Sequence, residues 1–250
     1  MNLERKIVLV TGGSSGIGQA IAAGCAAAGA DVLLTYRRNR EGADDTARRI
    51  RELGRRAEVV EADVSREQDV LALAETAHSL FGRVDAWINN AGADILTGDG
   101  KRLTRLEKLD LLLNVDLRGT ILASWAAVDQ MRRQSGGGVI INMSWDHVVI
   151  GMAGENPILY SAAKGGVMSF SKSLAREVAP TIRVNILAPG FIETSFGEDA
   201  TEEWRREVVN RTPFRRWGVP EDIVGAAVYL ASDAASFVTG QMLAINGGVV

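Results

Sequence analysis

The residues best suited to chemistry are a tyrosine and a lysine four positions apart in the segment YSAAK. If this segment is helical, Tyr160 and Lys164 share one face, with their Cβ atoms about 6 Å apart. A free phenol titrates near 10, which is too high for ready proton exchange at neutral pH, but an ammonium group about 4 Å away could lower that pKa to roughly 7. The pair therefore predicts a general acid or base. The same spacing also occurs in ordinary helices, where a buried tyrosine lies beside a solvated lysine.

A glycine-rich turn near the N-terminus supports the chemical interpretation. The segment TGGSSGIG at 11–18 follows an apolar run at 6–10 and precedes an alanine-rich stretch at 19–28, which is the strand, turn and helix order of dinucleotide-binding units. Glycines let the backbone approach a pyrophosphate closely, and a helix N-terminus offers unpaired N–H groups. The spacing G-x-x-x-G-x-G differs from the usual G-x-G-x-x-G, so its position in the chain carries the argument.

Composition excludes several other classes of protein. The net charge of −3 gives no basic field for nucleic acid or an anionic membrane. Cys25 is the only cysteine, so no disulfide can form within the chain, and two histidines, His78 and His147, are too few for a His/Cys metal site. The start of the chain runs directly into the first strand, and no apolar stretch is long enough and free enough of charge to cross a bilayer. We expect a cytoplasmic protein with no metal and no membrane or nucleic-acid partner.

Strand-like and helical patterns alternate along the whole chain. Strand patterns occupy 6–10, 31–36, 56–61, 84–89, 138–143, 182–187 and 242–245, and helical patterns occupy 19–28, 40–53, 66–81, 104–134, 157–179 and 220–232. This alternation predicts an α/β fold, a Rossmann-type doubly wound parallel sheet of about seven strands with helices on both faces, in one domain spanning 1–250. Ligands of such sheets bind at the carboxyl ends of the strands. Within the long irregular stretch at 189–219, we expect residues 191–217 to form a substrate lid.

With these elements in place, the chain resembles the short-chain dehydrogenase/reductase family across essentially its whole length, especially its 3-oxoacyl-carrier-protein reductases and glucose dehydrogenases. The matching segments are TGGSSGIG at 11–18, Asp63-Val64, NNAG at 89–92, Tyr160 with Lys164, Pro189-Gly190 with Ile192 and Thr194, and GQMLAINGG at 240–248. The resemblance implies hydride transfer between a nicotinamide C4 and the carbon of a small carbonyl or alcohol substrate. It implies that Tyr160 exchanges a proton with the substrate oxygen, while Lys164 lowers the pKa of that phenol and holds the nicotinamide ribose.

The resemblance also assigns the cofactor-binding residues by position. They are Gly12, Ser14, Ser15, Gly16, Ile17 and Gly18 at the pyrophosphate, Asp63 and Val64 at the adenine, Asn90, Ala91 and Gly92 on the adenosine side, and Pro189, Gly190, Ile192 and Thr194 at the carboxamide. Each segment also has a plain structural explanation. Asn-Gly and Pro-Gly sequences are typical of turns, and Asp63 could cap the following helix, although Ser65 fits that position better.

Two positions depart from the family pattern. The strand before the active site ends in Ser144-Trp145, so a strict alignment puts Trp145 where the catalytic serine belongs. Ser144 is the nearest hydroxyl and is our candidate for that role; otherwise the donor comes from the 145–156 loop, with the Trp145 N–H or His147 first. Asp116 replaces the asparagine that holds a proton-relay water in the family, and it lacks the amide N–H donor. We expect a relay that is altered.

The end of the second strand bears on the choice of cofactor. Tyr36 stands where relatives that prefer NAD carry an acidic residue, and Arg37 and Arg38 follow it. Two guanidinium groups suit a 2′-phosphate, so we predict that NADP(H) is preferred and that NAD(H) use is possible. The alternative is a solvated basic loop.

In the lid, arginines alternate with glutamates, which favours a solvated helix face over a site for an acidic substrate.

Two further expectations concern assembly and activity. Apolar residues lie on more than one face of the helices at 104–134 and 157–179, namely Ile121, Trp125, Val128, Val167, Phe170 and Leu174. A helix with two apolar faces needs a second partner, and the family resemblance agrees, so we predict a homotetramer or at least a dimer.

The rival to an oxidoreductase is a non-catalytic dinucleotide-binding protein on the same fold, motivated by Trp145 and Asp116. An epimerase or dehydratase of the longer relatives fits less well, because no large C-terminal substrate domain follows.

Overall fold

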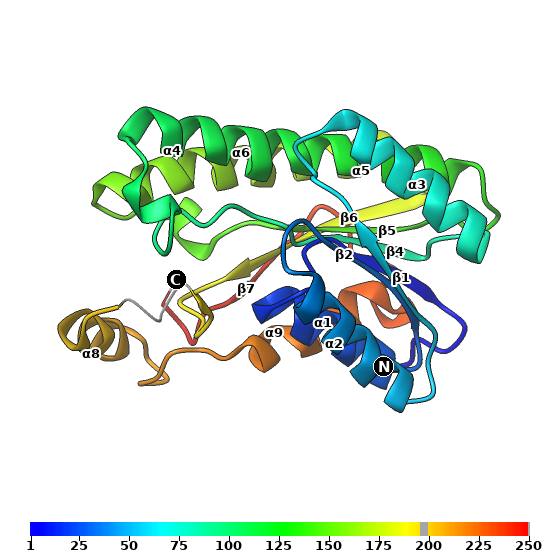
Figure 1. The fold of residues 1–250 in the computed structure, drawn as a ribbon, viewed down its shortest axis with the longest axis horizontal. Helices are drawn as coiled ribbons and strands as arrows, with labels where there is room; N and C mark the ends of the chain where they lie inside the picture. Colours follow the sequence, from blue (N-terminus) through cyan, green and yellow to red (C-terminus); the bar gives the residue numbers. More distant parts are fainter. Residues whose placement is uncertain (196–199, 250) are drawn as a thin grey trace.

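A seven-stranded parallel sheet forms the centre of the molecule in the computed structural model, which describes residues 1–195 and 200–249 (Figure 1). The strands are β1 (Ile7–Val10), β2 (Asp31–Tyr36), β3 (Ala57–Glu61), β4 (Ala86–Asn89), β5 (Gly138–Met143), β6 (Ile182–Pro189) and β7 (Met242–Ile245). They lie in the order β3-β2-β1-β4-β5-β6-β7. This confirms the predicted doubly wound α/β fold and its number of strands.

The strand order reverses at β1, which positions the site. Val8 of β1 pairs with Val32 of β2 on one side and with Ala86 of β4 on the other. The crossovers leave β1 in opposite directions along the sheet, and a crevice opens at the carboxyl ends of β1 and β4. In open α/β sheets ligands bind in such a crevice.

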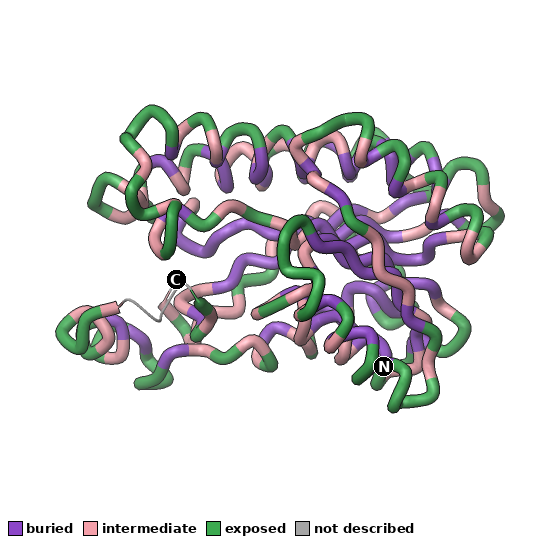
Figure 2. The backbone as a smooth tube through the Cα atoms, viewed as in Figure 1, coloured by how far each residue is buried: buried purple, intermediate pink, exposed green. Residues whose placement is uncertain are grey.

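Helices cover both faces of the sheet, as predicted (Figure 1). One layer contains α3 (Glu67–Phe81), α4 (Arg105–Leu112), α5 (Gly119–Arg132) and α6 (Glu155–Val178), and the other contains α1 (Gly16–Ala27), α2 (Arg40–Glu52) and α9 (Pro220–Ala231). Short helical segments lie at Gly100–Arg102, Asp146–Val148 and Asp233–Ala235. The inward sides of the helices are buried and their outward sides are exposed (Figure 2).

Side chains that alternate along each strand divide the core between the two faces. On β1, Val8 and Val10 contribute to the cluster under α1, α2 and α9, whereas Leu9 contributes to the cluster under α3, α5 and α6. Cys25 belongs to the first cluster, where burial raises the pKa of its thiol to about 12. Cys25 therefore packs as a small apolar residue of the core.

Helix α8 (Glu202–Arg211) lies in a stretch that the sequence analysis treated as irregular. Thr201 caps it, because its hydroxyl accepts a hydrogen bond from the Trp204 N–H at 3.2 Å, and Glu202 and Glu203 occupy its first turn. Both features are helix start signals. Helix α1 also differs from expectation, since it begins at Gly16 rather than at Gln19. The glycine turn therefore supplies the first turn of the helix itself.

The long helix predicted at 104–134 is interrupted by a π-helical segment at Leu113–Arg118 between α4 and α5. Over Arg105–Arg132 it is long and apolar enough to cross a membrane by length and composition alone, contrary to the sequence expectation. Within its most apolar window 56% of the helix is buried, because α5 packs on α3, α6 and the sheet. This is the burial of a core helix.

Candidate active site

One cavity of about 840 Å³ lies at the carboxyl ends of the strands. It runs from the glycine turn and the end of β2, past β4 and β5, to the segment after β6 and α8. The predicted cofactor-binding residues all line it, and so do Ser144, Tyr160 and Lys164. Asp116 is the exception among the predicted site residues. It lies behind the cavity wall, fully buried.

The glycine turn forms a cradle that side chains would fill. Gly12 has a φ of 68°, and a Cβ on it would lie 2.9 Å from the Ala91 Cα. Gly16 has a φ of 53°, and a Cβ on Gly18 would lie 2.2 Å from the Gly12 carbonyl oxygen. Only glycine meets these requirements. The exposed backbone at the start of α1 therefore fits a pyrophosphate, which needs close approach and free N–H groups.

Asn90 fixes this cradle to β4. Its side-chain amide donates hydrogen bonds to the Thr11 and Gly12 carbonyl oxygens, each at 3.1 Å. The Thr11 hydroxyl in turn accepts from the N–H groups of Asn90 and Ala91, at 3.1 and 3.0 Å. Asn90 borders the cavity as predicted, but its amide is committed to holding the glycine loop.

The far end of the cavity, beyond β2, carries two arginines. Tyr36 is buried, and its hydroxyl bonds to Glu61 and Arg40, each at 3.2 Å. Arg37 lies 3.9 Å from the Asp63 carboxylate, with 44% of its side chain exposed. Arg38 has no acidic partner among residues 1–195 and 200–249. Both guanidinium groups therefore border the cavity with little or no competing charge.

Asp63 and Val64 line the cavity after β3. Asp63 accepts hydrogen bonds from the Ser65 N–H at 3.0 Å and from its hydroxyl at 2.6 Å. Burial acts to raise the pKa of Asp63, but the Ser65 bonds and the Arg37 charge outweigh it and lower that pKa. Arg66 is the residue at the N-cap of α3, with no side-chain hydrogen bond. The expectation that Ser65, or else Asp63, caps this helix was therefore wrong; both shape the turn before it.

Tyr160, Lys164 and Asp116 come together where β5 ends. The first turns of α6 place the tyrosine and lysine on one face, and the Lys164 Nζ lies 5.5 Å from the centre of the Tyr160 ring. Asp116, on the π-helical segment, lies 2.8 Å from that Nζ and accepts the Ala93 N–H at 3.0 Å. The Lys164 ammonium also donates to the Met143 carbonyl at 3.2 Å. The π-helical segment thus brings a buried carboxylate to the lysine.

This arrangement changes the electrostatics expected from the pair alone. Burial by itself lowers the pKa of Lys164, but Asp116 and Tyr160 outweigh it and raise that pKa, so the amine stays protonated. Burial raises the pKa of Tyr160, Lys164 lowers it, and Asp116 and Asp94 raise it further, with a net rise. The expected net lowering of the phenol pKa is therefore wrong. Burial, together with the charges of Asp116 and Asp94, outweighs the effect of the Lys164 ammonium.

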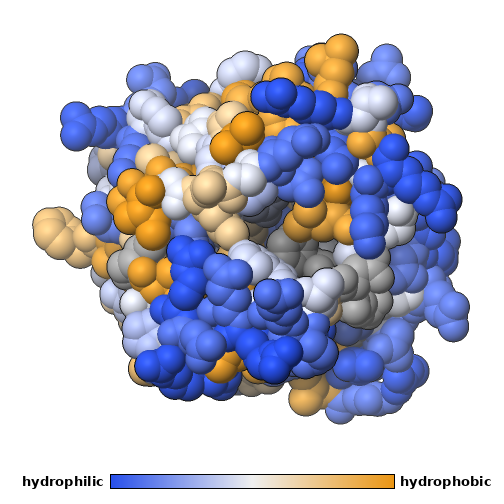
Figure 3. Space-filling view, turned by 90° about the vertical axis from the view of Figure 1, so that its left-hand side faces the viewer, coloured by the Kyte–Doolittle hydropathy of each residue, from blue (hydrophilic) through white to orange (hydrophobic). Residues whose placement is uncertain are grey.

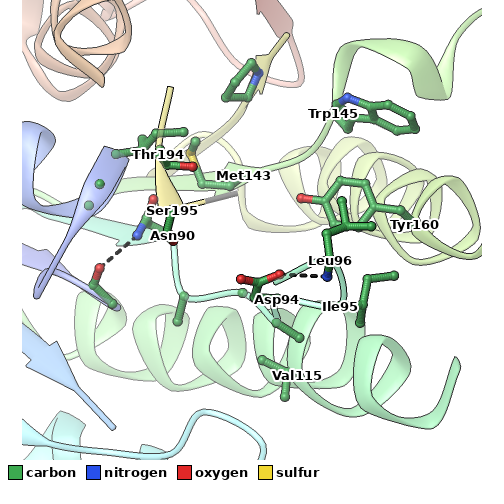
Figure 4. A pocket seen from close by; sticks show the side chains of 18 of the residues that line it. Asn90, Asp94, Ile95, Leu96, Val115, Met143, Trp145, Tyr160, Thr194 and Ser195 are labelled. Atoms are coloured by element: carbon green, nitrogen blue, oxygen red, sulfur yellow. Dashed lines mark hydrogen bonds between the residues drawn. The ribbon is translucent and has the colours of Figure 1, made fainter. Parts of the chain in front are cut away.

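Ser144 and Trp145 occupy different parts of the wall. The Ser144 hydroxyl donates to the Lys164 carbonyl oxygen at 2.8 Å, so it joins the end of β5 to α6. The Trp145 ring meets the Tyr160 ring edge-on, at 5.4 Å between centroids. Its indole N–H has no hydrogen-bond partner in the described part of the chain. Figure 4 shows the Tyr160 hydroxyl pointing into the cavity, with Trp145 on one side of the ring and Ile95 and Leu96 on the other.

The loop after Trp145 is anchored to the residue that follows the edge strand β7. Asp146 is fully buried and bonds to the His147 ring at 2.6 Å and to the Asn246 amide at 3.1 Å. His147 in turn stacks on Trp145 at 4.7 Å between centroids. The sequence analysis named this loop as an alternative source of the second donor. It could not place Asn246, because that residue is 100 positions away.

The expected lid at 191–217 is partly described, since residues 196–199 lie outside the described ranges. Thr194 lies over the glycine turn, where its Cγ2 would be 3.2 Å from a Cβ on Gly16. Phe191 and Trp204 also line the cavity, and the sequence analysis did not single them out. The sequence feature that could have identified these two residues is their position within the predicted lid at 191–217. Arg211 lies 3.5 Å from Glu207, in agreement with a solvated helix face on α8.

Comparisons with known proteins cover the same sheet and cavity. A family model described as enoyl-(acyl carrier protein) reductase matches residues 12–250. The 3beta-hydroxysteroid dehydrogenase 1 of Eggerthella lenta is 39% identical over 251 residues, which cover 99% of this chain and 95% of that protein. The L-rhamnose 1-dehydrogenase (NAD(P)(+)) of a Sphingomonas species is 38% identical over 250 residues, covering 99% and 97%. A crystal structure of a short-chain type dehydrogenase/reductase from Mycobacterium marinum has a TM-score of 0.92 at 30% identity, covering 100% of this chain and 97% of that one.

Proposed function

Because this chain belongs to the short-chain dehydrogenase/reductase family and is an NAD(P)-dependent oxidoreductase, we propose that it transfers a hydride between NADP(H) and a carbonyl or secondary alcohol. The observation that carries the proposal is the buried group of Tyr160, Lys164 and Asp116 at the cavity wall. It places a phenol beside a charge-neutralised lysine, within the same cavity as the glycine cradle. A hydride acceptor and a proton donor would therefore share one site.

The chain's own residues hold the cofactor and move the proton. NADP(H), when bound, would supply or accept the hydride at its nicotinamide C4. The glycine cradle would take the pyrophosphate, and Thr194 and Ile192 would border the carboxamide. In reduction the Tyr160 hydroxyl would donate its proton to the substrate oxygen, and in oxidation the phenolate would take it back. A phenol with a raised pKa stays protonated at neutral pH, which suits the reducing direction.

Trp145 is the group we propose as second donor to the substrate oxygen. The hydroxyl of Ser144 is directed to the Lys164 carbonyl, whereas the Trp145 ring lines the cavity beside Tyr160. Its indole N–H is unpaired within the described ranges, and an indole can donate but not accept. This proposal replaces the initial choice of Ser144 and keeps the alternative that the loop supplies the donor.

The preference for NADP(H) rests on the two arginines after β2. Arg37 and Arg38 border the cavity, and Tyr36 supplies no carboxylate that would repel a 2′-phosphate. A charge-assisted hydrogen bond contributes about 1.5–3 kcal/mol. The 3.9 Å contact between Arg37 and Asp63 is long and partly exposed, so a phosphate could compete for that arginine.

We also propose self-association through the face of α5 and α6. Trp125 on α5 is 55% exposed, which is unusual for so large an apolar side chain. Of the six residues that motivated this prediction, Val128, Val167 and Leu174 are buried within the chain and Ile121 and Phe170 are partly buried. The proposal therefore rests mainly on Trp125, and a monomer by light scattering at micromolar concentration would contradict it. A cytoplasmic location stays a prediction.

The test of the proposed function has a binding arm and a turnover arm. NADPH and NADH are titrated by fluorescence, and turnover is followed with a panel of ketones and aldehydes. The proposal expects tighter binding of NADPH and oxidation of the cofactor by at least one carbonyl compound. A protein that saturates with cofactor and turns over none of them would favour the non-catalytic rival.

A further inference from the structure

The substrate end of the cavity is walled by a continuous series of aromatic rings. From the Tyr160 ring the series passes to Trp145 at 5.4 Å, to His147 at 4.7 Å and to Phe191 at 5.5 Å, measured between centroids. Phe191 then meets Trp204 at 5.6 Å with an interplanar angle of 86°. Four of these rings line the cavity itself, and His147 supports them from behind.

These rings come from separate elements that meet only at this end of the sheet. Tyr160 lies on α6, Trp145 follows β5, Phe191 follows β6 and Trp204 lies on α8. Ile95 and Leu96, in the loop after β4, face the Tyr160 ring from the other side (Figure 4). The view onto this end of the molecule shows a hollow with hydrophobic and hydrophilic side chains around it (Figure 3). The proposed acid therefore lies between two apolar surfaces.

Three of the polar side chains nearby are engaged with the protein itself, although Glu155 and Ser195 also line the cavity. The Asp94 carboxylate accepts the N–H groups of Leu96 and Thr97, at 2.8 and 2.9 Å, and the Thr97 hydroxyl. The Asn156 side-chain oxygen accepts from the Lys108 ammonium at 3.1 Å. Together with the Ser144 hydroxyl, these side chains have few free hydrogen-bonding positions for a ligand. Along the aromatic wall, a polyhydroxylated ligand would lose hydration without regaining an equal number of hydrogen bonds.

We propose that the substrate is a ketone, or its secondary alcohol, carried on a flat and otherwise apolar ring system that packs along the Trp145–Phe191–Trp204 wall. The inference rests on the proposed hydride transfer and narrows its substrate class. The substrate oxygen would meet the Tyr160 hydroxyl, and the ring system would extend toward α8. A sugar would place several hydroxyl groups against the same rings, and each unpaired group would weaken binding by about 5- to 150-fold.

The test compares an apolar bicyclic alcohol, 2-tetralol, with D-glucose and L-rhamnose, all in the oxidising direction with NADP⁺ in excess. We expect kcat/KM for 2-tetralol to exceed that for either sugar by at least about 100-fold. In parallel, binding of 2-tetralone and of the two sugars to the protein saturated with NADP⁺ is measured by calorimetry. Higher kcat/KM or tighter binding for a sugar would overturn the inference, and so would failure of 2-tetralone to bind.

The binding arm separates this inference from the proposed function. If 2-tetralone binds and the sugars do not, yet no alcohol is oxidised, the substrate surface stands and the hydride transfer fails. If a sugar is oxidised faster than 2-tetralol, hydride transfer stands and the apolar surface is wrong.

Trp204→Ala tests the wall without touching the proposed acid. Removal of the indole ring should raise KM for 2-tetralol by about tenfold and leave the affinity for NADPH unchanged. Trp204→Phe keeps an aromatic ring at this position, so its KM should be close to that of the wild type. Phe237→Ala removes an aromatic ring that is fully exposed and away from the cavity, so it serves as the matched control. An unchanged KM in Trp204→Ala would contradict a substrate that reaches α8.

Discussion

The two ends of the cavity are built in different ways. At the cofactor end, the backbone of the glycine turn and residues directly at the ends of β2, β3 and β4 form the wall, so each residue's place follows from its own strand. At the substrate end, Trp145, Phe191 and Trp204 meet from three elements distant in the sequence. A buried carboxylate, Asp116, stands behind the proposed acid. The cofactor end is therefore built from positions next to single strands, whereas the substrate end depends on contacts between separate elements.

Removing the Tyr160 hydroxyl should have the largest effect, because it lies at the junction of the two ends. Tyr160→Phe keeps the ring against Trp145, and the lost hydroxyl has no hydrogen-bond partner within residues 1–195 and 200–249. Turnover should therefore fall by about 10²–10⁴-fold, as for a general acid, while the affinity for NADPH and the melting temperature stay close to wild type. Steady-state kinetics and cofactor titration measure both. Retention of most activity would contradict the assignment of Tyr160 as the general acid.

The next effect concerns the second donor at the substrate end. Trp145→Phe keeps an aromatic ring and removes the indole N–H, so turnover should fall on the order of 10²-fold if this group donates to the substrate oxygen. Ser144→Ala should change turnover by less than about tenfold, because its hydroxyl is directed to the Lys164 carbonyl. The reverse ranking of these two variants would return the donor role to Ser144.

At the cofactor end, the expected change concerns selectivity between cofactors. Arg37→Ala combined with Arg38→Ala should lower the preference for NADPH over NADH by roughly 10- to 150-fold, which corresponds to one charge-assisted contact. Arg40→Ala is the matched control, since Arg40 bonds to Tyr36 and Asp44 and does not line the cavity. An unchanged ratio of dissociation constants in the double variant would remove the basis for the NADP(H) preference.

The subtlest effect should be a displaced pH profile. Asp116 raises the pKa of Tyr160, and oxidation needs the phenolate, so the rate of alcohol oxidation should rise with pH as this group deprotonates. Asp116→Asn removes that negative charge, which lowers the pKa of Tyr160 and moves the rising limb of the profile to lower pH. The groups facing the phenol from the surrounding elements are Lys164, Asp116 and Asp94. Asp94→Asn should move the limb in the same direction, and a shift to higher pH in Asp116→Asn would contradict this electrostatic account.

The sequence predicted the sheet and which residues lie at the carboxyl ends of its strands, for a physical reason. Apolar runs separated by helical periods determine a parallel sheet, and residues directly after a strand must lie at its carboxyl edge. The glycines of the turn could therefore be placed before the structure was known, and so could Arg37, Arg38 and Asp63. The alternation of arginine and glutamate in the lid indicated a solvated helix face, but the bounds of α8 were not predicted, although Thr201 and the two glutamates after it are start signals.

The substrate end could not be predicted to the same depth. The spacing of Tyr160 and Lys164 gave the pair, but the net pKa shift of Tyr160 depends on its burial and on Asp116. Asp116 lies 48 positions before the lysine and is brought to it by a π-helical segment. No local pattern separates this segment from a continuous helix. The direction of the Ser144 hydroxyl likewise depends on a contact between β5 and α6, which the residue's own neighbours in sequence do not determine.

The most direct test of the central claim follows the hydride itself. The protein is incubated with 2-tetralone and NADPH that carries deuterium at both C4 positions of the nicotinamide, and the alcohol product is analysed by mass spectrometry and NMR. With the wild-type protein we expect one deuterium per product molecule, bound to the carbinol carbon, and with Tyr160→Phe a lower rate. Alcohol product that forms without deuterium at that carbon would contradict hydride transfer from the cofactor.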